Sequence, residues 1–366
     1  MSTITESPSR SFLPGLPVWT MAAPLLAAAV YVGAAMGLGG LYVMLIAAGV
    51  AVSVFAAVHH AEVVAHRVGE PFGTLVLALA VTLIEVALIV SLMVAAGAEA
   101  SALARDTVFA AVMIILNGIV GLCLLVGGLK HREQGFSLDG VSASLAALAV
   151  IAVMTMVFPN FTVTTPGPYY SPSQLLLIAV VSLVIYCAFV FTQTVGHRQY
   201  FLDGGADESH GHPPPNAVAA ASAVLLVLCL VAVVLLAKKL APHLETALAN
   251  AGAPEALVGV VIAGIVLLPE GLAAVRAARQ NRLQTSLNLA LGSALASIGL
   301  TVPAVVAVSF WLGAKLVLGI DAKSMILLML SLLVTTLVLR TGRTIILHGV
   351  VLLVIFAVYI FTTVVP

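Results

Sequence analysis

The sequence predicts an all-α polytopic membrane protein. Apolar residues make up 62% of the 366 residues and charged residues only 8%, whereas charged residues make up roughly 25% of a soluble domain. The mean hydropathy is +1.19. The apolar runs are long and continuous, whereas strands of membrane barrels alternate apolar and polar residues over segments of about ten. A soluble fold is excluded, because it would lack the polar residues to cover its surface.

A helix needs about 20 apolar residues to cross the hydrocarbon core of a bilayer. About eleven such runs are present, at residues 17–37, 39–58, 74–97, 107–129, 141–158, 174–195, 217–237, 256–275, 284–312, 324–339 and 344–365. The second helix is expected to continue to about His66. The Gly-rich join at Gly37–Gly40 leaves a different division of the first two spans open.

The basic residues predict the orientation of the spans. With eleven alternating spans, ten Lys and Arg residues fall on the side of the N-terminus and five on the other side. The N-terminus is therefore predicted in the cytoplasm and the C-terminus outside. Fifteen basic and fifteen acidic residues cancel, so nucleic acid is not an expected partner. The cysteines Cys123, Cys187 and Cys229 lie in apolar runs and are expected to be buried and unpaired.

The domain organisation follows from one hydrophilic segment, residues 197–216, which is rich in carboxylates, histidines and prolines. It is predicted to be a mobile cytoplasmic linker, because it can bury almost nothing. Residues 1–38 form an N-terminal tail and an extra helix, 39–196 a first repeat of helices 2 to 6, and 217–366 a second repeat of helices 7 to 11. Five spans in each repeat force opposite orientations, as in many secondary transporters.

Two glutamates lie deep inside predicted spans. Glu85 and Glu270 each fall in the second span of their repeat. A carboxylate inside a membrane is expensive and is a functional candidate. Two neighbouring carboxylates cannot both stay ionised in a dry site, so the pair needs protons or a cation. Competition between a hard dication and protons is the chemistry of a cation/proton antiporter. The alternative is one structural, hydrogen-bonding glutamate in each repeat.

Residues beside each glutamate are expected to supply further oxygens. Pro269 lacks a backbone donor and frees a carbonyl about one turn upstream, and Gly271 follows Glu270. In the first repeat the hydroxyl of Thr82 lies one turn before Glu85. An ordinary helix kink is the alternative role for Pro269.

The following span of each repeat carries polar side chains. Asn117 is flanked by hydrocarbon, and its amide would be unfavourable against lipid. Asn288, Ser293 and Ser297 lie together in the second repeat, with the two serines on one helical face. Small residues there also allow close helix packing, which is the alternative role for the serines.

Two stretches of the chain resemble the signature regions of the calcium/proton antiporters. They read HHAEVVAHRVGEPFGTLVLALAVTLIEVALIVSLM and LLPEGLAAVRAARQNRLQTSLNLALGSALASIGLTVP. The strongest resemblance is to the bacterial ChaA-type branch, in the cation/proton exchanger group of the calcium/cation antiporter superfamily. It covers essentially the whole chain and implies eleven helices with an acidic linker between the sixth and seventh.

The resemblance also implies site residues and a substrate. Glu85 and Glu270 match the glutamates that bind Ca²⁺ or protons, Ser293 matches a serine of helix 9, Asn117 an asparagine of helix 4, and Glu62 an acidic position late in helix 2. Ca²⁺ is then the transported substrate and protons the counter-ion, with no organic cofactor.

The sequence departs from the wider exchanger pattern at three places. Val81-Thr82 and Val266-Leu267 stand where that pattern has Gly-Asn before each glutamate, and Met113 replaces a serine. Fewer side-chain oxygens remain, so Na⁺/H⁺ or K⁺/H⁺ exchange at the same site stays open.

The function predicted is export of Ca²⁺ in exchange for protons across a bacterial inner membrane. An intramembrane enzyme would need a His/Asp or metal motif that the sequence lacks, and a channel needs no paired titratable carboxylates. No Walker motif is present, so the proton gradient is the expected energy source. The sequence leaves a homo-oligomer open.

Overall fold

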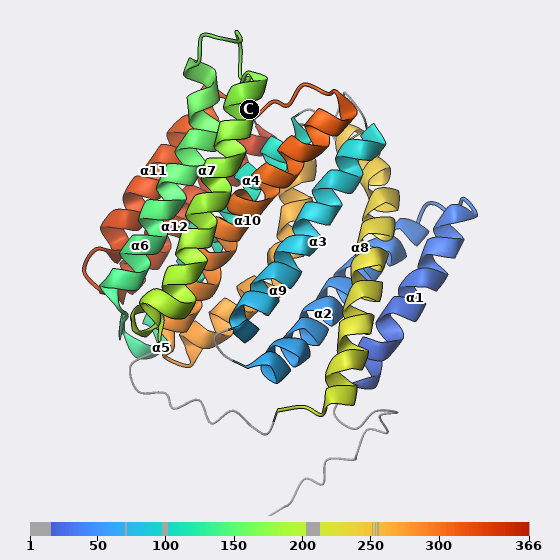
Figure 1. The fold of residues 1–366 in the computed structure, drawn as a ribbon, viewed down its shortest axis with the longest axis horizontal. Helices are drawn as coiled ribbons and strands as arrows, with labels where there is room; N and C mark the ends of the chain where they lie inside the picture. The colour runs from blue at the N-terminus through green and yellow to red at the C-terminus, as the bar shows by residue number, and fades with distance from the viewer. Residues whose placement is uncertain are drawn as a thin grey trace, which may run out of the picture. The chain divides into compact units, whose positions relative to one another are not determined.

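The computed structural model describes residues 16–69, 72–96, 102–202, 213–250, 252, 254 and 256–365. Within these ranges the chain forms eleven continuous helical segments (Figure 1). Ten are long and apolar enough to cross a membrane, and the remaining helix, α3, contains the apolar stretch Thr82–Ser91. The prediction of an all-α polytopic membrane protein is confirmed.

Of the first six helical segments, three are plain α-helices and three include short π-helical or 3-10 turns. They are α1 (Val18–Ala35), α2 (Tyr42–Val68), α3 (Phe72–Ala96), α4–η2–α5 (Leu103–Met113, Ile114–Ile119, Val120–His131), α6–η3–η4 (Leu138–Ala152, Val153–Val157, Phe158–Phe161) and α7–η5 (Pro172–Phe191, Thr192–Gly196). Three of the inserted turns, η2, η3 and η5, are π-helical. A short 3-10 turn, η6 (Arg198–Phe201), follows.

The other five segments are unbroken α-helices. They are α8 (Asn216–Asn250), α9 (Ala256–Arg279), α10 (Leu283–Leu312), α11 (Ala322–Leu339) and α12 (Ile346–Val364). Most ends lie within a few residues of the predicted spans. The exception is α8, which continues to Asn250 although the apolar run ends before Lys238 and Lys239. Long basic side chains extend their apolar stems along a helix surface, so these lysines do not interrupt the helix.

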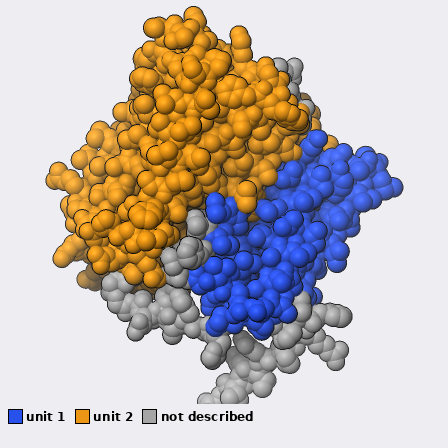
Figure 2. All heavy atoms as spheres, in the orientation of Figure 1, with its two compact units in different colours: residues 1–81, 209–240 blue, residues 82–208, 241–366 orange. Residues whose placement is uncertain are grey.

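Contacts divide the chain into two compact units, coloured separately in Figure 2. Unit 1 contains residues 1–81 and 209–240, and unit 2 contains residues 82–208 and 241–366. Two of the three boundaries cut a helix, α3 in one case and α8 in the other, and the third lies outside the described residues. The units therefore do not coincide with the predicted repeats. The repeats are defined by internal symmetry and not by contacts, and they stay a prediction. Much of the predicted linker, residues 203–212, lies outside the described residues.

Unit 1 is organised around a buried histidine. α1 packs along α2, and His60 of α2 is fully buried. Its Nε2 lies 3.2 Å from the carbonyl oxygen of Thr20 on α1, and its Nδ1 lies 3.4 Å from the hydroxyl of Ser222 on α8. His60 thus links three helices. Glu62, on the same helix, is exposed.

Unit 2 is built around α10. This helix packs against α4, η2, α6, α7 and α9 (Figure 1). Its buried residues lie on all sides of the helix, as expected for a helix enclosed by others. The helical segment Leu103–His131 is also largely buried. Cys123 and Cys229 are buried as predicted, each in its own unit. The prediction for Cys187 is wrong, because it lies on the outward face of α7 and is exposed.

Two short strands were not predicted. β1 (Glu133–Gly135) pairs antiparallel with β2 (Arg343–Ile345), with Gln134 opposite Thr344. Strands of three residues are too short to give a period-two pattern in the sequence. The pair joins the turn after α5 to the turn before α12, and an ion pair between Arg343 and Glu133, at 3.1 Å, adds to it.

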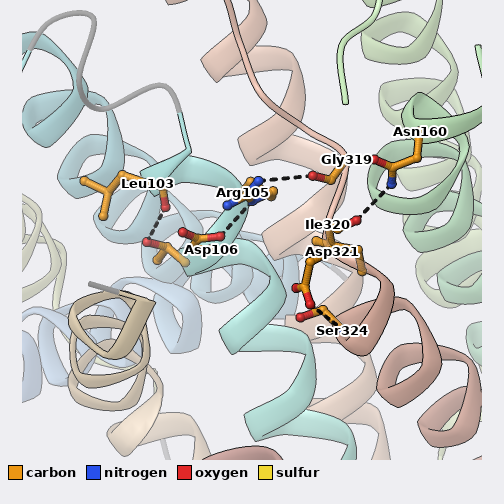
Figure 3. A network of polar contacts seen from close by, with 9 residues as sticks. Leu103, Arg105, Asp106, Asn160, Gly319, Ile320, Asp321 and Ser324 are labelled. Carbon is orange, nitrogen blue, oxygen red and sulfur yellow. Dashed lines mark hydrogen bonds and ion pairs between the residues drawn. The ribbon is translucent and has the colours of Figure 1, made fainter. Parts of the chain in front are cut away.

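A polar network ties the start of α4 to the segment before α11 (Figure 3). Arg105 pairs with Asp106 at 2.7 Å and donates to the carbonyl of Gly319 at 3.1 Å. Asn160 donates to the carbonyl of Ile320 at 2.9 Å. Asp321 caps α11 by accepting from the backbone of Ser324. These contacts hold the ends of three helical segments of unit 2 together.

Candidate functional site

Two carboxylates of unit 2 meet two hydroxyls on one turn of α10. Glu85, on α3, is 6% exposed. Ser297 donates its hydroxyl hydrogen to Glu85 Oε2 at 2.6 Å. Ser293 donates in the same way to Oε2 of Glu270, on α9. Because the serines are four positions apart, they lie on one face of α10. This single helical turn therefore contacts both glutamates.

The local sequence explains why α9 approaches its neighbours so closely. α9 continues without a break through Pro269, which is buried. A Cβ atom built on Gly271 would lie 3.2 Å from Cδ1 of Ile119 in η2. That distance is shorter than an ordinary van der Waals contact, so the absence of a side chain at Gly271 lets α9 pack on η2. The predicted supporting residue Gly271 thus has a packing role beside Glu270.

The site holds two ionisable carboxyl groups, and neither has a basic partner in the described part of the chain. In the described part of the chain the ion pairs on Arg105 and Arg343 are made with other carboxylates, and no basic side chain pairs with either glutamate. Glu85 Oε1 is buried and has no hydrogen-bond partner. An uncompensated charge in such a place is costly, so the pair requires protons or a cation.

The polar side-chain atoms that meet at this turn of α10 are oxygens. Among the residues that the structure describes, no group of three or more His, Cys, Asp or Glu side chains is placed so that it could hold a metal ion. The carboxylates and the two hydroxyls are hard donors, which suit Ca²⁺ or a monovalent cation better than a transition metal. Thr82 is also buried, one turn before Glu85.

Asn117 lies in the π-helical segment η2 and is fully buried. Its Nδ2 donates to the carbonyl of Met113 at 3.3 Å and to the hydroxyl of Ser331 on α11 at 2.9 Å. Its Oδ1 is buried without a hydrogen-bond partner. The structure therefore joins Asn117 to Ser331, and no hydrogen bond links it to either glutamate.

Asn288 belongs to a different network. Its Nδ2 donates to the carbonyl of Phe201 at 2.5 Å, and its Oδ1 accepts from Gln284 at 2.8 Å. Gln284 in turn accepts from the backbone of Ser137 at 2.7 Å. The amide of Asn288 thus connects the start of α10 to η6 and the start of α6. Glu62, the other supporting candidate, belongs to unit 1.

Ser331 is the polar partner that the sequence analysis missed. It is fully buried in α11, in the apolar run MILLMLSLLV. A lone serine inside such a run was the available signal. It is weak by itself, because serine also satisfies its hydroxyl with a backbone carbonyl of its own helix.

Comparison with known proteins covers nearly the whole chain. The sodium/calcium exchanger protein family model matches residues 38–195 and 221–365. The protein y4hA of Sinorhizobium fredii is 48% identical, over 96% of this chain and 97% of the relative. The sodium-potassium/proton antiporter ChaA of Escherichia coli is 39% identical, over 86% of each chain.

A solved structure supports the fold. The crystal structure of the Ca²⁺/H⁺ antiporter protein YfkE aligns with 96% of this chain and 100% of that chain, with a TM-score of 0.72 and 17% sequence identity. Identity this low supports the fold alone. The match to the family model and the identities to the two relatives come from the sequence and do not depend on this structural similarity. The chain therefore belongs to the sodium/calcium exchanger protein family, whose members are secondary transporters and not enzymes.

Proposed function

We propose that the chain is a secondary antiporter that exports Ca²⁺ from the cytoplasm in exchange for protons. The observation that carries the proposal is the pair of carboxylates, Glu85 and Glu270, bound to one turn of α10 through Ser297 and Ser293. Neither carboxylate has a basic partner among the described residues. In the proposed mechanism this pair alternately holds the cation and protons.

The charge of the site supports competition between cation and protons. Glu85 is buried and Glu270 is partly buried, and together they carry up to two negative charges. A low dielectric makes these charges expensive unless they are neutralised. One dication neutralises both, and two protons do the same. A site that must be filled by one or the other couples their movements when it opens to each side of the membrane in turn. Alternation between inverted repeats is the expected motion, and no organic cofactor takes part.

The oxygen count supports Ca²⁺ as a substrate. Ca²⁺ takes about 6 to 8 oxygen ligands at flexible angles. Two carboxylates offer four oxygens, and Ser293 and Ser297 offer two more. We include Asn117 in the ligand set as well, because its amide oxygen is buried without a partner. Thr82, Pro269 and Gly271 support this shell by their position next to the glutamates.

A second candidate function is Na⁺/H⁺ or K⁺/H⁺ exchange at the same site. The observation that favours it is the 39% identity to a protein named as a sodium-potassium/proton antiporter, against 17% for the structure named as a Ca²⁺/H⁺ antiporter. Leu267 and Met113 stand where the wider pattern has an asparagine and a serine, so two side-chain oxygens expected from that pattern are absent. This loss also suits a cation that needs fewer ligands than Ca²⁺.

Transport in inside-out membrane vesicles tests both candidates. A proton gradient is formed first, and Ca²⁺, Na⁺ and K⁺ are then added in turn while the gradient is followed with a fluorescent dye. We expect Ca²⁺ to dissipate the gradient in vesicles that contain the wild-type chain. The variants Glu85→Gln and Glu270→Gln should be silent. Glu133→Gln, which removes an exposed carboxylate of unit 2, is the matched control.

The outcomes separate the candidates. Dissipation by Na⁺ or K⁺ alone would establish the second function and overturn the first. Dissipation by no cation would overturn the antiport proposal. The same vesicles also test the predicted orientation of the chain in the membrane. A protease added to the cytoplasmic face should cut the N-terminal tail and spare the C-terminus.

A further inference from the structure

Asn117 and Ser331 form a buried polar pair inside an apolar core. Both residues are fully buried, and they lie 214 positions apart in the sequence, on η2 and α11. Asn117 Nδ2 lies 2.9 Å from Ser331 Oγ. The two elements also contact each other. The mechanism described above does not use Ser331.

The direction of this hydrogen bond follows from the other contacts of the serine, which are with the carbonyl of Leu327 and with the sulfur of Met113, 3.6 Å from its hydroxyl oxygen. Ser331 donates its hydroxyl hydrogen to the carbonyl of Leu327, one turn earlier on α11, at 2.7 Å. A serine hydroxyl has a single hydrogen. Toward Asn117 it can therefore only accept, and it must face the NH₂ end of the amide.

Met113 reinforces the same orientation. Its carbonyl oxygen accepts from Asn117 Nδ2 at 3.3 Å, and its sulfur lies 3.8 Å from the same nitrogen. All three neighbours of this nitrogen are acceptors, so a flipped amide would place oxygen against oxygen. The flipped state is electrostatically repulsive. The carbonyl end of the amide, Oδ1, is consequently turned away from these groups.

Oδ1 is left buried with no hydrogen-bond partner. A buried acceptor without a partner is uncommon in a folded protein and calls for an explanation. The residue sits in a π-helical turn, an arrangement frequent at functional sites. The same turn packs on α9 beside Glu270, through the contact of Ile119 with Gly271. The free oxygen thus belongs to a segment that adjoins the carboxylate site.

We propose that Ser331 is a positioning residue that sets the cation affinity of the site. It holds the amide of Asn117 so that Oδ1, and not the NH₂ group, is available to an incoming cation. This inference rests on the proposed antiport function. Without the Ser331 hydroxyl, the amide loses the nearest of the acceptors that distinguish its two ends, and only the longer contacts with Met113 remain. A turned amide presents positive hydrogens that repel a cation.

The test compares five variants of the full-length protein, among them Asn117→Ala, which is the reference for the double variant. Ser331→Ala removes the acceptor, and Ser331→Thr keeps it. Thr335→Val is the matched control, because Thr335 lies one turn further along α11, is equally buried, and has no hydrogen-bond partner on its hydroxyl. The double variant Asn117→Ala/Ser331→Ala tests whether Ser331 acts through the amide.

Two measurements are made. The first is the solid-state NMR signal of the side-chain amide of Asn117 in lipid, which reports its hydrogen bonds without transport. The second is cation-dependent proton flux over a range of Ca²⁺, Na⁺ and K⁺ concentrations. We expect Ser331→Ala to shift the amide signal and to raise the KM of the transported cation by about 10-fold or more, with the maximal rate retained. Ser331→Thr should restore the KM, and Thr335→Val should leave both readouts unchanged.

Three results would overturn the proposal. They are an unchanged amide signal in Ser331→Ala, a fall in maximal rate at constant KM, or an undiminished effect of Ser331→Ala in the Asn117→Ala background. A wild-type chain that exchanged no cation for protons would instead overturn the proposed function, and the amide signal would then decide the positioning role by itself.

Discussion

Ser293 and Ser297 lie four residues apart on α10, and each donates its hydroxyl hydrogen to a different carboxylate, Glu270 and Glu85 respectively. One turn of one helix thus contacts glutamates from two other helices. A shift of α10 would alter the surroundings of both carboxylates together. The arrangement gives a physical basis for treating the glutamates as one site.

Removal of either negative charge should leave the fold intact. Glu85→Gln and Glu270→Gln keep the size of the side chain, and a neutral amide is less costly to bury than a carboxylate. We expect the melting temperature of the purified variants, at alkaline pH without cation, to equal or exceed that of the wild type. Addition of Ca²⁺ should stabilise the wild type only. A lower melting temperature in both variants would indicate structural glutamates.

The two serines should contribute to cation binding separately from the charges. Ser297→Ala and Ser293→Ala each remove a hydrogen bond to a carboxylate, and a hydrogen bond to a charged group is worth about 1.5–3 kcal/mol. We expect each variant to bind the cation about 10-fold or more weakly, measured by calorimetry, and to retain measurable exchange. Ser309→Ala is the control, because Ser309 is a buried serine of the same helix that donates only to the carbonyl of Val306. An equal effect of Ser309→Ala would point to a general loosening of α10.

Much of the site could be predicted because membrane spans make polar residues conspicuous. Glu85 and Glu270 stand out in apolar runs, and the spacing of Ser293 and Ser297 already places them on one helical face. The positions of the spans followed from the lengths of the apolar runs. These inferences use only local pattern and the cost of burial.

The pairings between helices could not be predicted. Ser297 meets a glutamate 212 positions away, and Ser331 meets an amide 214 positions away. No periodicity in a single sequence determines such tertiary contacts. Asn288 was predicted to support the site because it lies near Ser293 in the sequence. In the structure its amide instead donates to the carbonyl of Phe201. The π-helical turn at Asn117 likewise depends on packing rather than on a local signal.

The close contact between α9 and η2 predicts a graded response at Gly271. An added Cβ would lie 3.2 Å from the end of the Ile119 side chain, which can give slightly, whereas a branched side chain cannot be accommodated. We expect Gly271→Ala to be mild and Gly271→Val to cost about 1–3 kcal/mol of stability, measured by thermal unfolding in detergent. Ile119→Ala should partly rescue Gly271→Val. Gly264, on the same helix, has nothing within 4 Å of an added Cβ, so Gly264→Val is the control and should be tolerated.

Competition between protons and cation at one site predicts the sign of the pH dependence. At low pH the carboxylates hold protons, so the cation must displace them and its apparent affinity is low. As the pH rises the protons leave, and the apparent affinity should rise until both carboxylates are free, after which it should be constant. A single group exchanging one proton gives a slope of at most one decade of affinity for each pH unit, and two coupled groups give up to two.

Calorimetry in two buffers of different ionisation enthalpy measures the protons released when a cation binds. We expect wild-type protein to release between one and two protons for each Ca²⁺ at the lower end of the pH range, and none on the alkaline plateau. Glu85→Gln or Glu270→Gln should lower the number released by about one in any residual binding, because each removes one titrating group. Glu133→Gln should leave the number unchanged. Binding of Ca²⁺ with wild-type affinity but without proton release at any pH would refute antiport by competition, whichever residues hold the ion.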